Sequence, residues 1–97
     1  MRIIWSPLAI DRVSEIALYI AQDDITASEK WIHSIFNRVE QLIEFPESGR
    51  TVPETRREDI RELLFRNHRI IYRIRPEEIA ILTIRHTKQI LPEEDIN

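Results

Sequence analysis

Three side chains in the second half of the sequence could together perform phosphate chemistry. Arg61, Arg85 and His86 lie in or at the end of segments rich in isoleucine and leucine. Guanidinium groups can stabilise a pentavalent phosphate and an imidazole can move a proton, so this set, with Glu62 or Arg73 nearby, could support RNA cleavage by a 2′-hydroxyl group. The reaction needs a base, an acid and charge stabilisation. One histidine on a strand can provide only part of this set. His86 could equally be an ordinary residue at the end of a strand.

Other catalytic and metal-binding patterns are missing from the sequence. There is no cysteine, which excludes a disulfide, a thiolate metal site and a thiol nucleophile. No glycine-rich phosphate loop is present, and His33, His68 and His86 do not have the spacing of metal ligands. We therefore predict neither a metal site nor a cofactor.

The elements that must position the candidate residues begin with a strand and two helices. Residues 2–5 are short, apolar and β-branched, which predicts a strand, and Ser6 and Pro7 then supply a helix cap and a first helical proline. This helix should end near residues 22–24. Thr26 with Glu29 has the form of a capping box and opens a second apolar periodicity that continues to Ile43. The short connection predicts an antiparallel helix hairpin.

Three β-like runs follow a loop that holds the only glycine. They cover residues 60–65, 69–75 and 79–85, and their short joints predict hairpin pairing in an antiparallel meander. The helix hairpin should cover the apolar face of this sheet, which gives an α+β fold. In the second run Arg69, Arg73 and Arg75 alternate with apolar residues, so we expect guanidinium groups to line an uncovered face.

Charge is unevenly distributed along the chain. The net charge of −3 argues against a general nucleic-acid coat and against sequence-specific DNA binding by this chain alone. Residues 1–49 carry four basic and eight acidic side chains, whereas residues 50–91 carry ten basic and six acidic ones. The basic second half is compatible with a localised acidic partner or with a solvated sheet face.

Length and hydropathy predict one soluble domain over residues 1–97. The sequence has 97 residues, of which 42% are hydrophobic and 32% charged. The N-terminus has no apolar signal region, and no run reaches the roughly 18 to 20 apolar residues of a membrane span, so we expect a cytoplasmic protein without a membrane partner. Residues 92–97 are acidic with almost nothing apolar to dock, which predicts a mobile tail.

The order of strand, helix hairpin, loop and three-stranded meander resembles the ParE/RelE toxin fold over nearly the whole chain. Five segments are similar to the ParE branch in their amino acids as well as in their order. They are Trp5-Ser6-Pro7 with Ala9 and Asp11, Phe45-Pro46-Glu47-Ser48-Gly49-Arg50 with Val52-Pro53-Glu54, Ile60-Arg61-Glu62-Leu63, Arg69-Ile70-Ile71-Tyr72-Arg73-Ile74, and Ile81-Leu82-Thr83-Ile84-Arg85-His86.

The resemblance implies a type II toxin that blocks replication by acting on DNA gyrase. It also implies a small ParD-like antitoxin that wraps and neutralises the toxin, in a possible toxin–antitoxin hetero-oligomer. The residues expected to bind the target or the antitoxin are Arg61, Arg69, Tyr72, Arg73, Arg75, Arg85, His86 and Lys88.

Two alternatives remain open. RelE-like ribosome-dependent ribonucleases use a cluster of Lys, Arg, His or Glu and a tyrosine near the end of the last strand, and Arg61, Arg85 and His86 resemble part of that pattern. Thr87 stands where a tyrosine is expected in the subset that ends in His-Tyr, which favours the gyrase inhibitor over the mRNA endonuclease. The other alternative is an inactive toxin that survives as an antitoxin-binding co-repressor.

Overall fold

The first helix is capped by a side chain that also forms a hydrogen bond to the last strand. The computed structural model describes residues 1–96. After strand β1 (Arg2–Trp5), helix α1 (Pro7–Ala21) begins as predicted, with the Ser6 side chain accepting a hydrogen bond from the Ala9 amide at 3.0 Å. The Ser6 hydroxyl also donates to the Leu82 carbonyl at 2.8 Å. One side chain thus caps α1 and holds it against the last strand.

The second helix begins earlier than the capping-box pattern predicts. Helix α2 (Ile25–Glu40) is capped by Asp24, whose carboxylate accepts from the Ala27 amide at 3.0 Å, so the prediction of Thr26 as the cap is wrong. Asp and Thr are both good caps, and Asp24 comes first after the turn, which leaves Thr26 inside the helix. A 3₁₀ turn, η1 (Gln41–Ile43), extends the helix.

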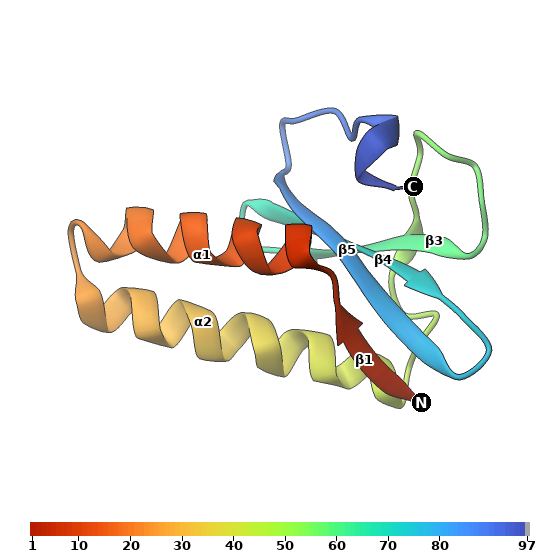
Figure 1. The fold of residues 1–97 in the computed structure, drawn as a ribbon, viewed down its shortest axis with the longest axis horizontal. Helices are drawn as coiled ribbons and strands as arrows, with labels where there is room; N and C mark the ends of the chain where they lie inside the picture. The colour runs from red at the N-terminus through yellow and green to blue at the C-terminus, as the bar shows by residue number, and fades with distance from the viewer. Residues whose placement is uncertain (97) are drawn as a thin grey trace.

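The strands form one mixed five-stranded sheet in the order β1-β5-β4-β3-β2. The short β2 (Arg50–Thr51) precedes β3 (Ile60–Phe65), β4 (His68–Ile74) and β5 (Glu78–His86), and these pair as the predicted antiparallel meander. β1 pairs with β5 in parallel and forms one edge of the sheet, so the first and last strands are neighbours (Figure 1). The α+β fold class is confirmed. The structure adds two features that were not predicted, namely the parallel pairing of β1 with β5 and the short strand β2.

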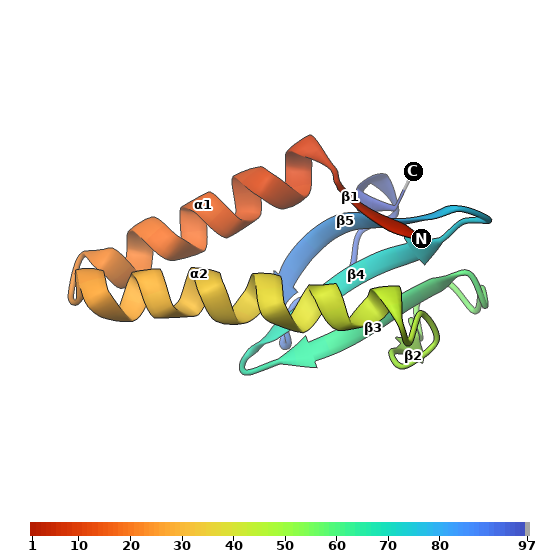
Figure 2. The same ribbon diagram turned by 90° about the horizontal axis from the view of Figure 1, so that it is seen from below.

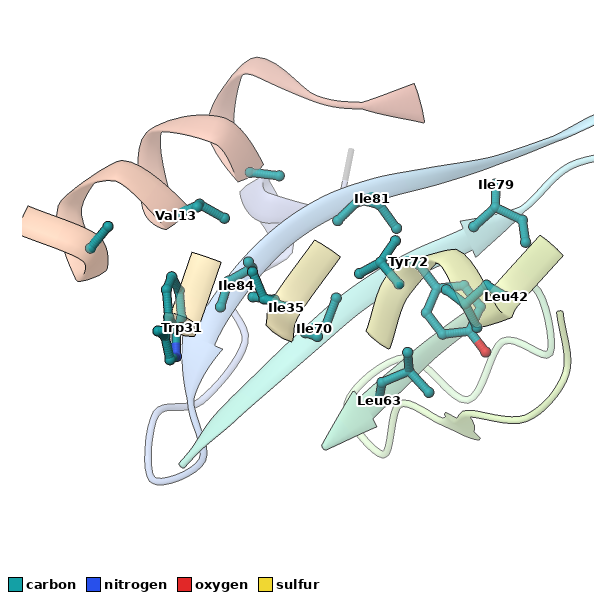
Figure 3. Packing of buried hydrophobic residues seen from close by; sticks show 13 residues of the cluster. Val13, Trp31, Ile35, Leu42, Leu63, Ile70, Tyr72, Ile79, Ile81 and Ile84 are labelled. Carbon is teal, nitrogen blue, oxygen red and sulfur yellow. The ribbon is translucent and has the colours of Figure 1, made fainter. Parts of the chain in front are cut away.

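The main core lies between the helix hairpin and one face of the sheet. Figures 1 and 2 show α1 and α2 side by side, with the loop end of the hairpin projecting beyond the strands. Figure 3 shows Trp31 and Ile35 of α2 beside Ile70 and Ile84, and Tyr72 further along the same buried cluster near Leu42 and Leu63. Burial of this apolar area is the principal stabilising contribution to the fold.

The opposite face of the sheet is also covered, which contradicts the expected open face of arginines. Val52, Ile60, Ile71 and Leu91 form a second buried cluster against which Ile96 packs. The loop before β3 and the chain after β5 supply the covering residues, so apolar side chains share this face with the arginines. The expectation failed because the covering segments are irregular and have no periodicity to reveal them.

The segment after β5 lies against this second face and includes a 3₁₀ turn, η2 (Glu93–Asp95). Asp95 is 8% exposed and Leu91 is 3% exposed. The expectation that this segment has almost nothing to dock is therefore wrong for residues 92–96, because Ile96 and the Asp95 carboxylate both find partners on the sheet. Its mobility stays a prediction, and Asn97 lies outside the described residues.

Candidate functional site

Arg85 forms an ion pair on the second face of the sheet. Its guanidinium donates to the Asp95 carboxylate at 2.8 Å through Nε and approaches the same oxygen at 2.7 Å through a terminal nitrogen. The Thr83 hydroxyl adds a contact of 3.4 Å to that carboxylate. This ion pair compensates the charge of Arg85 and fastens η2 to β5.

Arg69 lies at the centre of a buried ionic network. It is 6% exposed and donates to Glu62 at 2.8 Å and to both carboxylate oxygens of Glu54, at 2.9 and 2.8 Å. The hydrogen bond from Arg69 lowers the pKa of Glu54 to about 2, and the same bond raises the pKa of Arg69. Arg69 is thus an internal structural residue, and its charge is not available to a partner.

Arg61 lies on the face of the sheet opposite to Arg85. In the strand register Arg61 is paired with Tyr72, which belongs to the helix-covered core, whereas Arg85 is paired with Arg69 on the second face. The Arg61 guanidinium donates to the Gly49 carbonyl at 2.9 Å and to the Glu58 carbonyl at 3.1 Å. The structure therefore does not bring Arg61 to Arg85 and His86.

The strand register explains this separation. His86 is paired with His68, and His68 is paired with Phe65, four residues further along β3 than Arg61. At roughly 3.3 Å per residue, Arg61 and Phe65 are about 13 Å apart along the strand. The expectation of a triad assumed that the neighbouring strands align these residues, and the hairpin turns set a different alignment.

The remaining strand residues of the predicted set differ in their accessibility. Arg73 contacts Asp59 at 3.1 Å and Arg75 contacts Glu78 at 3.2 Å, and both guanidinium groups are partly exposed at the surface. Tyr72 is completely buried, and burial raises the pKa of its hydroxyl. Of these three residues, only Arg73 and Arg75 can touch another molecule directly.

His86 stands at the mouth of a pocket that the strand pattern did not reveal. Its ring lies 5.7 Å from that of His68, which in turn lies 6.0 Å from that of Trp31. Burial, followed by the neighbouring His86, lowers the pKa of His68. Lys88 is exposed next to this pair, and its backbone amide donates to Nδ1 of His86 at 3.2 Å.

The pocket lies between the second half of α1 and the ends of the three central strands. Its volume is about 600 Å³, within the size range of ligand and anchor-residue pockets. It is lined by Glu15, Ile16, Tyr19, Ile20, Trp31, Arg66, Asn67, His68 and His86. We call it the strand-end pocket. The sequence patterns did not indicate Arg66 and His68. The available signal was the two-residue turn that makes His68 the first residue of β4, which begins beside the end of β5 at His86.

Arg66 gives this pocket a positive rim. Its φ of 54° is an uncommon backbone conformation for a residue with a side chain, and it forms the turn between β3 and β4. Among the described residues Arg66 and Lys88 take part in no ion pair, whereas Glu15 is paired with Arg12 at 3.2 Å. An apolar wall beside unpaired cations suits an apolar side chain accompanied by a carboxylate.

Two further properties concern the part of the chain from residue 1 to residue 96. No cluster of three or more histidine and acidic side chains there could hold a metal ion. None of the helices in that part has the length and apolar character needed to traverse a lipid bilayer.

Comparison with solved structures first defines the class of fold. A chain described as "Chromosomal ParDE TA system from P. aeruginosa" superposes with a TM-score of 0.72, and the match covers 89% of this chain and 95% of that one at 24% identity. At this identity the likeness establishes the architecture, which is the ParE/RelE-like fold expected from the sequence.

Sequence comparison then identifies the family. Residues 3–91 match the family described as "ParE toxin of type II toxin-antitoxin system, parDE". A relative from Sinorhizobium fredii named "Putative toxin Y4kP" is 36% identical over 94 residues, which span 95% of this chain and 94% of the relative. The chain belongs to the ParE toxin family of type II toxin–antitoxin systems.

Proposed function

We propose that this ParE-family protein inhibits DNA gyrase by binding and is neutralised by a ParD-like antitoxin. The family resemblance suggests the target. The observation that supports inhibition without RNA cleavage is the placement of Arg61 and Arg85 on opposite faces of the sheet, each held by its own partners. A ribonuclease site would need these guanidinium groups to converge on one phosphate.

The strand-end pocket is the proposed binding site for an acidic segment of the antitoxin. Arg66 and Lys88 provide charges that no described acidic residue neutralises, and Trp31 and Ile16 provide an apolar wall. Arg73 and Arg75 lie at the opposite end of β4 from this pocket, and each already contacts one carboxylate. Binding in the strand-end pocket would produce a toxin–antitoxin hetero-oligomer, consistent with the description of the P. aeruginosa structure as a ParDE system.

The target is tested by inducing the protein without antitoxin in growing bacteria. Gyrase inhibition predicts that DNA synthesis falls before protein synthesis and that a DNA-damage response follows. The variant His86→Ala should retain at least about half of this effect, because a binding surface tolerates loss of one rim residue better than a catalytic site tolerates loss of its proton carrier. Early failure of protein synthesis, abolished by His86→Ala, would instead identify an mRNA endonuclease.

Antitoxin binding is tested separately with paired charge reversals. The double variant Arg66→Glu/Lys88→Glu should weaken binding of the co-expressed antitoxin by about tenfold or more, because like charges across an interface repel. Lys30→Glu, at an exposed position on α2, is the control for a general effect of surface charge. Unchanged affinity in the double variant would remove the strand-end pocket from the proposed interface and leave the gyrase proposal intact.

A further inference from the structure

A second apolar hollow, here called the hairpin groove, lies between α1 and α2. Its volume is about 480 Å³. Val13 and Ala17 form its buried floor, and its walls include Leu18 from α1 and Ile32 and Phe36 from α2. Leu18 is 69% exposed, so the groove opens to solvent.

The sequence of α1 provides more apolar surface than the core uses. Ala9, Val13 and Ala17 face the core at four-residue intervals, while Ile10 and Leu18 form a parallel row one position further round the helix. Ile10 is 42% exposed. Contiguous exposed apolar side chains of this kind mark interaction surfaces on soluble proteins.

The rim of the hairpin groove is acidic. Asp11 shares a helical face with Leu18, seven residues away, and Glu29 and Glu40 lie at three- or four-residue spacing from the wall residues of α2. All three carboxylates are exposed and take part in no ion pair within residues 1–96. Because these carboxylates form no ion pair among the described residues, they leave a negative rim around an apolar floor.

From this arrangement we propose that the hairpin groove binds a basic amphipathic helix of a partner protein. A third helix can place its ridges in the groove between two helices, with apolar anchors at three- and four-residue spacing. The stretch from Ile10 to Leu18 is about 12 Å long at roughly 1.5 Å per residue, which matches about two turns of such a helix. Lysine or arginine beside the anchors would then meet the three carboxylates.

A second copy of this chain fits the groove less well than a basic helix does. A two-fold interface uses the same patch on both subunits, so the acidic rim of one copy would face the acidic rim of the other. Like charges facing each other across an interface oppose association. The rim thus selects against self-association and in favour of a cationic partner.

The hairpin groove is distinct from the strand-end pocket of the proposed function. Leu18 lines the groove, whereas its neighbour Tyr19 lines the pocket, so adjacent residues of α1 serve two surfaces of opposite charge. The inference does not depend on gyrase or on the acidic antitoxin segment. A failure of one proposal therefore leaves the other unaffected.

The test uses two peptides and the purified full-length chain. One is a peptide of about 14 residues with leucines at helical spacing and lysines elsewhere, and the other has the same leucines with glutamates in place of the lysines. Fluorescence anisotropy of labelled peptide measures the dissociation constant. The lysine peptide should bind at least about tenfold more tightly than the glutamate peptide.

Variants of the chain distinguish binding in the groove from attraction of the peptide by the overall negative charge. Leu18→Ser and the pair Asp11→Lys/Glu29→Lys should each weaken binding of the lysine peptide by about tenfold. The matched control is Glu77→Lys/Glu93→Lys, which changes the net charge equally at exposed positions outside the groove and should retain the wild-type affinity. Circular dichroism checks that each variant is folded.

Several outcomes would overturn the inference. Equal binding of both peptides, no binding of either, or equal losses in the groove variants and the control pair would each show that the groove does not select a basic helix. A dimer of the free chain by light scattering, dissociated by Leu18→Ser, would identify a second copy as the occupant. Selective binding of the lysine peptide, lost only in the groove variants, is the expected result.

Discussion

At the scale of single residues, Gly49 and Tyr72 join the loop to the core. The Gly49 amide donates to the Tyr72 hydroxyl at 3.0 Å, and that hydroxyl donates to the Pro46 carbonyl at 2.7 Å. A Cβ atom at position 49 would lie 2.5 Å from the Glu62 carbonyl oxygen and 2.6 Å from the Tyr72 hydroxyl. Glycine is therefore required here by close backbone approach, which explains the place of the chain's only glycine.

Gly49→Ala should lower the free energy of unfolding by about 1–3 kcal/mol, because the added methyl group forces the loop away from β3 and from Tyr72. Urea denaturation followed by circular dichroism measures the change. Ser48→Ala, at the exposed neighbouring position, should change stability by less than about 0.5 kcal/mol. Equal stability of wild type and Gly49→Ala would show that the loop is not held as described.

At the scale of elements, one ionic network connects β3, β4 and the segments that cover the second face. Glu54 from the loop before β3 binds Arg69 of β4 and also accepts from the Leu91 amide at 2.9 Å. Arg69 donates in addition to the Gln89 carbonyl at 3.0 Å. The charged residues expected to face solvent thus hold the two irregular segments together.

Stability should depend on pH through Glu54. Its pKa is lowered to about 2 in the folded chain from an ordinary value of 4.5, so the unfolded chain binds the proton more readily. The stabilisation is fully present above pH 4.5 and is lost as the pH falls towards 2. Glu54→Gln should lower the free energy of unfolding by about 2 kcal/mol at pH 7, with a smaller difference from wild type at pH 3.

Urea titrations of wild type and Glu54→Gln at the two pH values measure how the difference in their free energies of unfolding changes with pH. Glu44→Gln, at an exposed position that forms no ion pair among the described residues, is the control and should be as stable as wild type at pH 7. A constant difference between Glu54→Gln and wild type would contradict the assigned role of the Glu54 charge.

The segment after β5 should be protected from hydrogen exchange. The Leu91 amide is bonded to Glu54 and the Asp95 carboxylate is bonded to Arg85, so opening requires the loss of both contacts. Asp95→Asn should speed exchange at Leu91 by about tenfold, as the weaker contact with Arg85 makes local opening easier. Exchange in wild type at the rate of an unfolded chain would instead support the mobile tail expected from the sequence.

Local sequence patterns predicted the elements better than their lateral arrangement. Ser6 and Pro7 identify the first helix because a cap acts within one turn. The positions of Arg61 and Arg85 depend instead on strand register, and a register shift next to Tyr72 alters the pairing with β5. The parallel partner of β1 lies more than seventy residues away in the chain, where short-range periodicity carries no information.

The candidate site was predicted in part for the same reason. His86 and Lys88 were recognised at the end of the last strand, and the structure places both beside the strand-end pocket. Arg66 and His68 were missed because their contribution arises only when two hairpins bring three strand ends to α1. Arg69 was expected at an open surface because a single sequence does not show which acidic residues will pair with it in the folded chain.

At the scale of the whole molecule, charge is divided between two surfaces along α1. Within residues 1–96, the cations Arg66 and Lys88 at the strand-end pocket form no ion pair, and neither do the carboxylates beside the hairpin groove on both helices. A small domain can thus present separate surfaces to partners of opposite charge. This division leads to the proposal that the toxin can contact its inhibitor and another protein by different faces.

Gyrase inhibition is tested most directly by a supercoiling assay with purified DNA gyrase and the purified full-length chain. Inhibition by binding predicts a concentration-dependent loss of supercoiling that the antitoxin relieves and that His86→Ala retains. The same protein should leave ribosome-bound mRNA intact. Full gyrase activity at a large excess of folded protein, together with mRNA cleavage that His86→Ala abolishes, would show that the protein is an mRNA endonuclease and not a gyrase inhibitor.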